Sequence, residues 1–151
     1  MKYIRLYEEY RGTKRFIWIH GLPGSGKSHL ARALALNEDG TVQILDDTAS
    51  LEEVRAGIQD HDTVIFSSPY FEEYLGLRGM TNRLLTLLNN LEVRIEEWWF
   101  ENDSQACIKN LLKRGEDHAI GSRNILAEIM DFSKRYVIPE GARTVPVWRD
   151  K

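Results

Sequence analysis

The stretch Gly21-Leu22-Pro23-Gly24-Ser25-Gly26-Lys27-Ser28 fits the pattern G-x-x-x-x-G-K-[ST] at every fixed position. It follows the apolar run Phe16-Ile17-Trp18-Ile19 and precedes a helical pattern from His29 to Leu36. A strand, a glycine-rich turn and a helix in this order form a loop in which backbone N–H groups and the helix N-terminus face an anion. The sequence therefore predicts the phosphate-binding loop of a P-loop NTPase fold.

The loop predicts a nucleoside triphosphate, ATP, as ligand. Lys27 is expected to reach the β and γ phosphate oxygens, and the Ser28 hydroxyl is expected to bind a Mg²⁺ ion that keeps several of its waters. A glycine- and serine-rich turn can fit the pattern by chance, but the correct order of strand, loop and helix disfavours that alternative. The residues expected to bind the nucleotide are Gly21, Leu22, Pro23, Gly24, Ser25, Gly26, Lys27, Ser28 and His29.

Strand and helix patterns alternate along the rest of the chain. Strands are expected at 41–45, 63–66, 93–100 and 144–148, and helices after 50, at 81–89, from 104 to about 114, and from 122. The run 63–66 is apolar throughout, which indicates a strand buried on both faces. The alternation predicts an α/β fold, with a parallel sheet covered by helices on both faces and ligands at the carboxyl ends of its strands.

Length and composition favour one compact domain spanning residues 1–151. No apolar run approaches the roughly 20 residues that cross a bilayer, and the N-terminus lacks the apolar core of a signal peptide. We therefore expect no membrane contact and a cytoplasmic location. Cys107 is the only cysteine, which excludes an intrachain disulfide, and we expect it to be buried on a helix.

Charge is unevenly distributed along the chain. Residues 1–108 carry 11 Lys/Arg against 17 Asp/Glu, whereas residues 109–151 carry 9 against 6. A solvated helix face is the simple explanation for such a basic segment. The alternative is that it supplies the arginines that an enzyme of phosphoryl transfer needs.

Polar residues after the second and third predicted strands help to distinguish a GTPase, a motor and a kinase. A GTPase would need an Asn-Lys-x-Asp run, which the chain lacks, and a motor would need an acidic pair where Ser67-Ser68 stands. The acidic pair instead follows the second strand, as Asp46-Asp47. A carboxylate there can accept the proton of an attacking alcohol, as a kinase requires, although an aspartate can also simply cap the next turn.

With these features, residues 16–137 resemble the polynucleotide 5′-hydroxyl kinases and related phage P-loop kinases. The resemblance implies a three-layer P-loop sandwich with a short helical lid at approximately 113–124. It implies that Asp46 or Asp47, with Asp47 favoured, activates the acceptor hydroxyl. It also implies that Arg114 in the lid stabilises the transferring phosphoryl group, with Arg123 as a second candidate.

The acceptor is less well defined than the nucleotide. Polynucleotide kinases of this type carry an Asp-Thr-Asn-like run after the third strand and a separate phosphatase domain, whereas this chain has Ser67-Ser68-Pro69-Tyr70. A lone kinase domain of this size also resembles phage kinases that phosphorylate 5-hydroxymethyluracil in DNA. We therefore expect an ATP- and Mg²⁺-dependent kinase acting on a hydroxyl of DNA or of a nucleotide. The alternatives are a small-metabolite or nucleoside kinase, and an ATPase or ATP-binding module without kinase activity.

Overall fold

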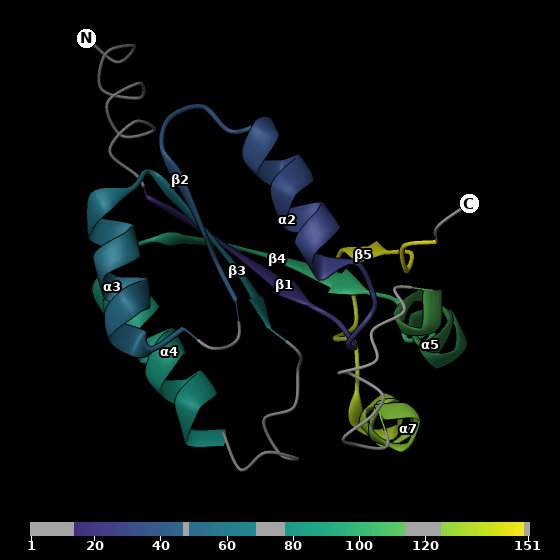
Figure 1. Ribbon diagram of the computed structural model, residues 1–151. Helices are drawn as coiled ribbons and strands as arrows, with labels where there is room; N and C mark the ends of the chain where they lie inside the picture. The colour runs from purple at the N-terminus through teal and green to yellow at the C-terminus, as the bar shows by residue number, and fades with distance from the viewer. Residues whose placement is uncertain (1–13, 47–48, 69–77, 114–124, 150–151) are drawn as a thin grey trace, which may run out of the picture.

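The computed structural model describes residues 14–46, 49–68, 78–113 and 125–149, which form a parallel sheet with helices packed against it (Figure 1). The sheet has five strands in the order β2-β3-β1-β4-β5, and each neighbouring pair is parallel. The strand that precedes the phosphate loop, β1, is therefore in the centre. Its neighbours are β3 and β4, two strands that lie far from it in the sequence.

The elements alternate as the sequence predicts. The strands are β1 (Arg15–His20), β2 (Val42–Leu45), β3 (Thr63–Ser68), β4 (Arg94–Phe100) and β5 (Thr144–Val145). The helices are α2 (Lys27–Leu36), α3 (Leu51–Asp60), α4 (Arg78–Asn90), α5 (Ser104–Lys113) and α7 (Ile125–Arg135). Local signals explain several of these boundaries. The Ser50 and Glu53 side chains form a reciprocal capping box at the start of α3, and Asp103 accepts a hydrogen bond from the Ala106 N–H at the start of α5.

Helices cover both faces of the sheet. On one face, Ala31 of α2 packs with Ile17, Ile19 and Ile65. On the other face, α3 and α4 pack against the alternate residues of the same strands, including Phe16 and Trp18. β1 is therefore buried on both sides, as are the central residues of β3, which confirms the expectation from their continuous apolar pattern.

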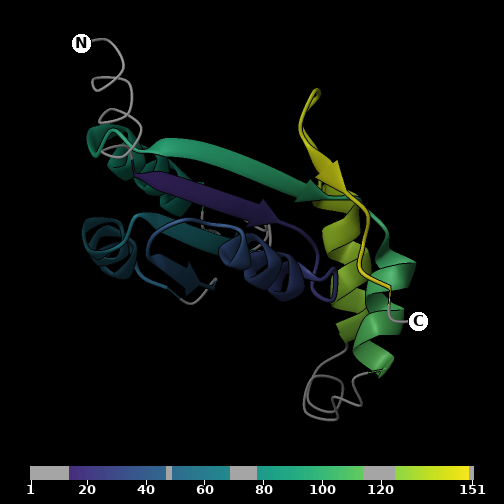
Figure 2. The same cartoon turned by 90° about the horizontal axis from the view of Figure 1, so that it is seen from above.

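A second pair of helices stands at the carboxyl end of the sheet. Figures 1 and 2 show α5 and α7 side by side, close to the points of the arrows that mark β1 and β4. Cys107 and Leu111 of α5 pack with Ile129 and Phe132 of α7 in a core that also contains Leu22 of the phosphate loop. Burial therefore fixes these helices next to the loop.

Two strand ends differ from the sequence-based expectations. β5, expected at 144–148, ends at Val145. Ser67 and Ser68, which the sequence places in a turn, are the last residues of β3, because their backbones pair with Ile19 and His20. In α5, Leu112 is 52% exposed, whereas its neighbour Leu111 is buried. Consecutive residues of a helix point about 100° apart, so burial of Leu111 turns Leu112 outward.

No helix in the described part of the chain combines the length and the apolar character needed to cross a lipid bilayer.

Candidate functional site

The phosphate loop lies at the point where the chain connections of the sheet change direction. From β1 the chain passes through α2 to β2, on one side of the sheet, whereas from β4, the neighbour of β1, it runs to β5 on the other side. In open α/β sheets, ligands bind in the crevice at such a switch point, beyond the carboxyl ends of the strands. The topology thus places the loop where this class of fold binds its ligands.

The loop backbone has the shape that an anion requires. Gly24 and Gly26 have φ angles of 83° and 105°, in the left-handed region that favours glycine, and Gly26 directly precedes α2. Leu22 and Ser25 are fully buried. The first N–H groups of a helix have no acceptor within the helix, and here they adjoin the glycine turn. The loop therefore offers backbone donors and positive potential to a phosphate group.

Lys27 folds back over the loop in the structure. Its ammonium group donates hydrogen bonds to the carbonyl oxygens of Gly21 and Leu22, each at 3.0 Å. An incoming polyphosphate offers the ammonium group stronger, charged acceptors than these neutral carbonyls. The side chain is thus within the loop, at the place from which the predicted contact with β and γ oxygens can form.

His20, directly before the loop, is a buried polar residue in an aromatic stack. Its ring lies 3.8 Å from the Trp99 ring, nearly parallel to it, and its Nε2 atom is 3.1 Å from a carboxylate oxygen of Glu97. Burial lowers the pKa of His20, although the hydrogen bond and charge of Glu97 oppose this shift. Burial therefore favours a neutral imidazole beneath the loop.

Tyr136 ties α7 to the same edge. Its buried hydroxyl donates to the Phe100 carbonyl oxygen at 2.5 Å and also lies 3.3 Å from the carbonyl oxygen of His20. These carbonyls end β4 and β1, so one side chain joins both strand ends to α7. Burial raises the pKa of this tyrosine, which keeps the hydroxyl protonated as a donor.

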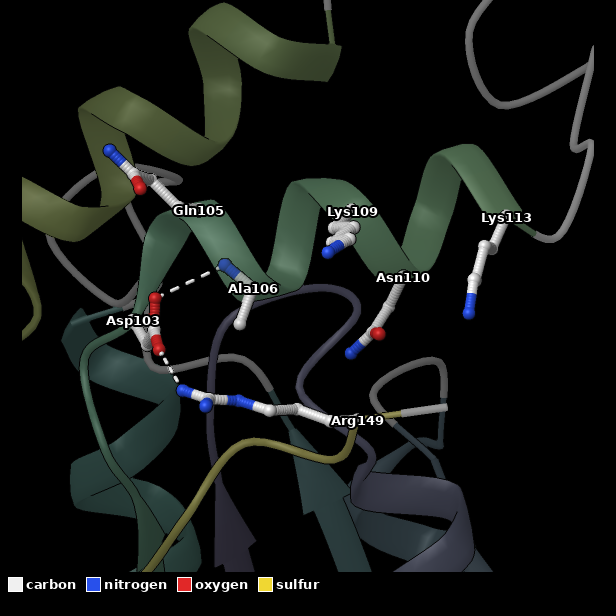
Figure 3. A pocket seen from close by; sticks show the side chains of 7 residues that line it. All are labelled: Asp103, Gln105, Ala106, Lys109, Asn110, Lys113 and Arg149. Carbon is white, nitrogen blue, oxygen red and sulfur yellow. Dashed lines mark hydrogen bonds and ion pairs between the residues drawn. The ribbon is translucent and has the colours of Figure 1, made fainter. Parts of the chain in front are cut away.

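A pocket of about 280 Å³ lies outside the loop, between α5 and the segment that follows β5. Figure 3 shows Asn110 and Lys113 projecting from α5 toward that segment, while the Arg149 side chain runs along the pocket to Asp103, with which it pairs at 2.8 Å. Asn110 also contacts the loop, so it separates this pocket from the phosphate cradle. The lining residues are Asp103, Gln105, Ala106, Lys109, Asn110, Lys113 and Arg149.

Cys107 is buried in α5, as expected from its place in the sequence. Burial raises the pKa of its thiol to about 11. A thiol with this pKa stays protonated near neutrality, which argues against a role as a nucleophile.

The candidate acid–base residue Asp46 directly follows β2, at the same edge of the sheet as the loop. Leu45 pairs with Phe66 of β3, which in turn pairs with Trp18 of β1. Two strand spacings, roughly 10 Å, therefore separate Leu45 from Trp18, and β1 continues beyond that level to His20. Asp46 is exposed to solvent, and its backbone oxygen accepts a hydrogen bond from the Ala49 N–H.

Three of the predicted site residues, Asp47, Arg114 and Arg123, lie outside the described residues, as does most of the expected lid. Among the residues that are described, no group of three or more His, Cys, Asp or Glu side chains is arranged to hold a metal ion. The exposed Ser28 lies in the first turn of α2, beside the loop. A Mg²⁺ ion bound by this hydroxyl and by phosphate oxygens stays a prediction.

The sequence analysis missed the two residues that hold the outer side of the loop, Asn110 and Trp148. The Asn110 amide donates to the carbonyl oxygen of Gly24, and the backbone N–H of Trp148 donates to that of Ser25. The sequence contained one indication of this role. Asn110 lies three residues after Cys107, near the inner side of the predicted helix, where a buried polar side chain needs a hydrogen-bond partner.

Comparison of the chain with known protein families finds no family that matches, and comparison with curated proteins finds no similar sequence. Function must therefore be argued from the site itself.

Proposed function

We propose that this protein is an ATP- and Mg²⁺-dependent kinase that transfers the γ-phosphate to a hydroxyl group of DNA or of a nucleotide. One observation carries the proposal. The phosphate loop after β1 and the carboxylate after β2 stand at the same edge of the sheet, on either side of β3. The strand between them ends in Ser67 and Ser68, which are poor bases for activating water.

The spacing of these groups suits direct transfer between two bound substrates. In a loop of this type the backbone N–H groups hold the inner phosphates of a triphosphate, and the lysine reaches the β and γ phosphates. β3 fills the sheet between β1 and β2, so the proposed acceptor would lie beyond the carboxyl end of β3, next to Ser67 and Ser68. The structure thus allows an alcohol to lie between Asp46 and the terminal phosphate.

In the proposed reaction, the acceptor oxygen forms a bond to the γ-phosphorus while its proton passes to the carboxylate of Asp46 or Asp47. The bond between the γ-phosphorus and the oxygen that bridges it to the β-phosphate breaks, and ADP leaves with that oxygen. Lys27 neutralises charge on the phosphates. Bound Mg²⁺ would supply further neutralisation, with Ser28 as its protein ligand.

The resemblance to polynucleotide and hydroxymethyluracil DNA kinases supports an acceptor in nucleic acid. The net positive charge of residues 109–151 is compatible with a polyanionic acceptor. Arg114 and Arg123 keep their proposed role in stabilising the transferring group, as residues of a lid that excludes water.

The test is to incubate the protein with γ-labelled ATP and Mg²⁺ and separate acceptors. These are single-stranded DNA with 5′-hydroxyl ends, DNA containing 5-hydroxymethyluracil, nucleosides, nucleotides and small alcohols. We expect label in one of the DNA acceptors or in the nucleotides, and much less label with Lys27→Ala. Labelling of DNA should fall steeply as salt is raised.

The other outcomes identify the alternatives. Label found only in small alcohols or nucleosides would indicate a small-metabolite or nucleoside kinase. Label released only as free phosphate would indicate an ATPase, and the kinase proposal would then be wrong.

A further inference from the structure

The outer side of the phosphate loop is held by residues distant in the sequence. The Asn110 side-chain amide donates to the Gly24 carbonyl oxygen at 2.9 Å and to the Trp148 carbonyl oxygen at 2.5 Å. The Trp148 N–H donates to the Ser25 carbonyl oxygen at 2.8 Å. One amide group therefore uses both of its donors to join α5, the loop and the segment after β5.

The contacts are close as well as polar. A Cβ atom on Gly24 would come 2.5 Å from the Cys107 carbonyl oxygen, and one on Gly26 would come 2.5 Å from the Cβ of Trp148. Backbone therefore lies directly against α5 at one glycine and against Trp148 at the other. The loop has no space to move outward at either position.

The segment that carries Trp148 is itself fixed on three sides. Val147 is 3% exposed and packs in the same core as Leu22 of the loop. The Trp148 ring stacks on His29, with 4.4 Å between the ring centroids, and Arg149 pairs with Asp103. The segment is thus held in place by its own packing, stacking and ion-pair contacts, and it can support the loop.

The direction of these hydrogen bonds matters for anion binding. Because the carbonyl oxygens of Gly24 and Ser25 are bound on the outside, these peptide groups cannot easily turn their oxygens inward, where they would repel phosphate. Holding a site in its binding conformation before the ligand arrives removes an ordering cost from binding. The contacts therefore favour the anion-binding form of the loop.

We infer that Asn110 and Trp148 are positioning residues of the phosphate loop, which hold the carbonyl oxygens of Gly24 and Ser25 outward and so keep them from facing a polyphosphate. The inference rests on the proposed function only in that the loop binds the phosphates of ATP. Asn110 is 8% exposed, and its amide acts through Gly24 without touching the ligand.

The experiment compares Asn110→Ala with Asn102→Ala. Asn102 is a matched control, because its amide also donates to two backbone carbonyls, those of Ser133 and Tyr136, without touching the loop. Binding of inorganic tripolyphosphate in the presence of Mg²⁺ is measured by calorimetry, and the melting temperature of each variant is recorded. Tripolyphosphate reports on the phosphate cradle alone.

We expect Asn110→Ala to weaken tripolyphosphate binding about ten-fold, as the loss of two hydrogen bonds that shape the site allows. Asn102→Ala should lower the melting temperature but bind tripolyphosphate as the wild type does. Equal affinity in wild type and Asn110→Ala would overturn the inference, as would an equal loss of affinity in both variants, which a general structural effect produces.

Trp148→Ala provides a second variant, because this side chain is 46% exposed and its removal should not prevent folding. We expect about three-fold weaker tripolyphosphate binding, since the stacking of the ring on His29 is lost, but the Cβ contact with Gly26 and the backbone bonds remain. Unchanged affinity in Trp148→Ala, together with an Asn110→Ala variant that does not fold, would also reject the inference. A wild type that does not bind tripolyphosphate would instead reject the ATP site, and with it the proposed function.

Discussion

The two sides of the phosphate loop differ in burial and in the hydrogen bonds that hold the backbone. On the β4–β5 side, Leu22, Ser25 and Asn110 are buried, and hydrogen bonds hold the loop from outside. On the β2–β3 side, Asp46 is exposed and Ile44 is 43% exposed. Buried contacts thus support the loop on one side, while Asp46 and Ile44 on the other side are exposed to solvent.

The open side also carries a groove of about 360 Å³ between α3 and α4, helices that follow β2 and β3. Its lining residues are Leu51, Glu52, Arg55, Asn82, Arg83, Thr86, Leu87 and Asn90. Donor phosphates are common to all reactions of ATP, so a rigid cradle suits them. An acceptor is recognised by its own chemistry, and exposed polar surfaces of this kind are where that recognition can vary.

The largest effect is expected on the open side, from Asp46→Asn combined with Asp47→Asn. Without a carboxylate to accept the hydroxyl proton, transfer should fall by about 10²- to 10⁴-fold, while ATP binding is retained. Turnover with labelled ATP and ATP affinity by calorimetry measure the two effects separately. The single variants then show which aspartate is the base. Full activity of the double variant would show that neither carboxylate takes part.

On the cradle side, Lys27→Ala should reduce kcat/KM by about 10²- to 10³-fold, because a charge aimed at the transferring phosphate is lost. Lys134→Ala, on an exposed position of α7, is the control and should keep wild-type kinetics. The assignment of the loop fails if Lys27→Ala retains wild-type turnover.

Gly24→Ala and Gly141→Ala test whether the cradle is tightly enclosed. Both glycines have positive φ, 83° and 78°, but a Cβ on Gly141 would meet nothing within 4 Å. Gly141→Ala should lower the free energy of unfolding by about 1–2 kcal/mol for its left-handed backbone. Gly24→Ala should lose a further ~1–3 kcal/mol from crowding against Cys107. Equal losses in denaturant titrations would contradict the close packing of the loop.

The smallest effect concerns His20. Its pKa is lower in the folded protein than the ordinary value of 6.5, so the unfolded chain binds a proton more readily. The stability that depends on a neutral His20 is therefore present above pH 6.5 and is lost as pH falls through the lower, folded pKa. Unfolding titrations at pH 7.5 and at lower pH should show a smaller pH dependence in His20→Phe than in the wild type. An unchanged dependence would mean that other groups cause it.

Local signals in the sequence predicted most of the fold. Continuous apolar runs located β1 and β3, because a strand that is buried on both faces shows this in a few neighbouring residues. The same signals did not predict that β3 continues through Ser67 and Ser68. Strand length there depends on pairing with β1, which the local sequence does not record.

Some residues of the candidate site could be predicted from the sequence, and others could not. The motif located the turn between β1 and α2, and the role of that turn and of Lys27 in binding phosphate stays a prediction. Asp46 is confirmed only in its position directly after β2, and its role as a base stays a prediction. Asn110 and Trp148 were not predicted from the sequence. Asn110 contacts Gly24, which is 86 positions away, and Trp148 contacts Ser25, which is also distant in the sequence.

The sequence by itself determined that a glycine-rich turn joins a buried strand to a helix, and that strands and helices alternate around it. Only the tertiary structure decided that β3 and β4 flank β1, that α5 and the segment after β5 support the loop, and that Leu112 faces solvent. The physical reason is the distance along the chain over which each kind of interaction acts. Backbone conformation and hydrophobic periodicity act between near neighbours, whereas the shape of the cradle depends on which distant surfaces are buried together.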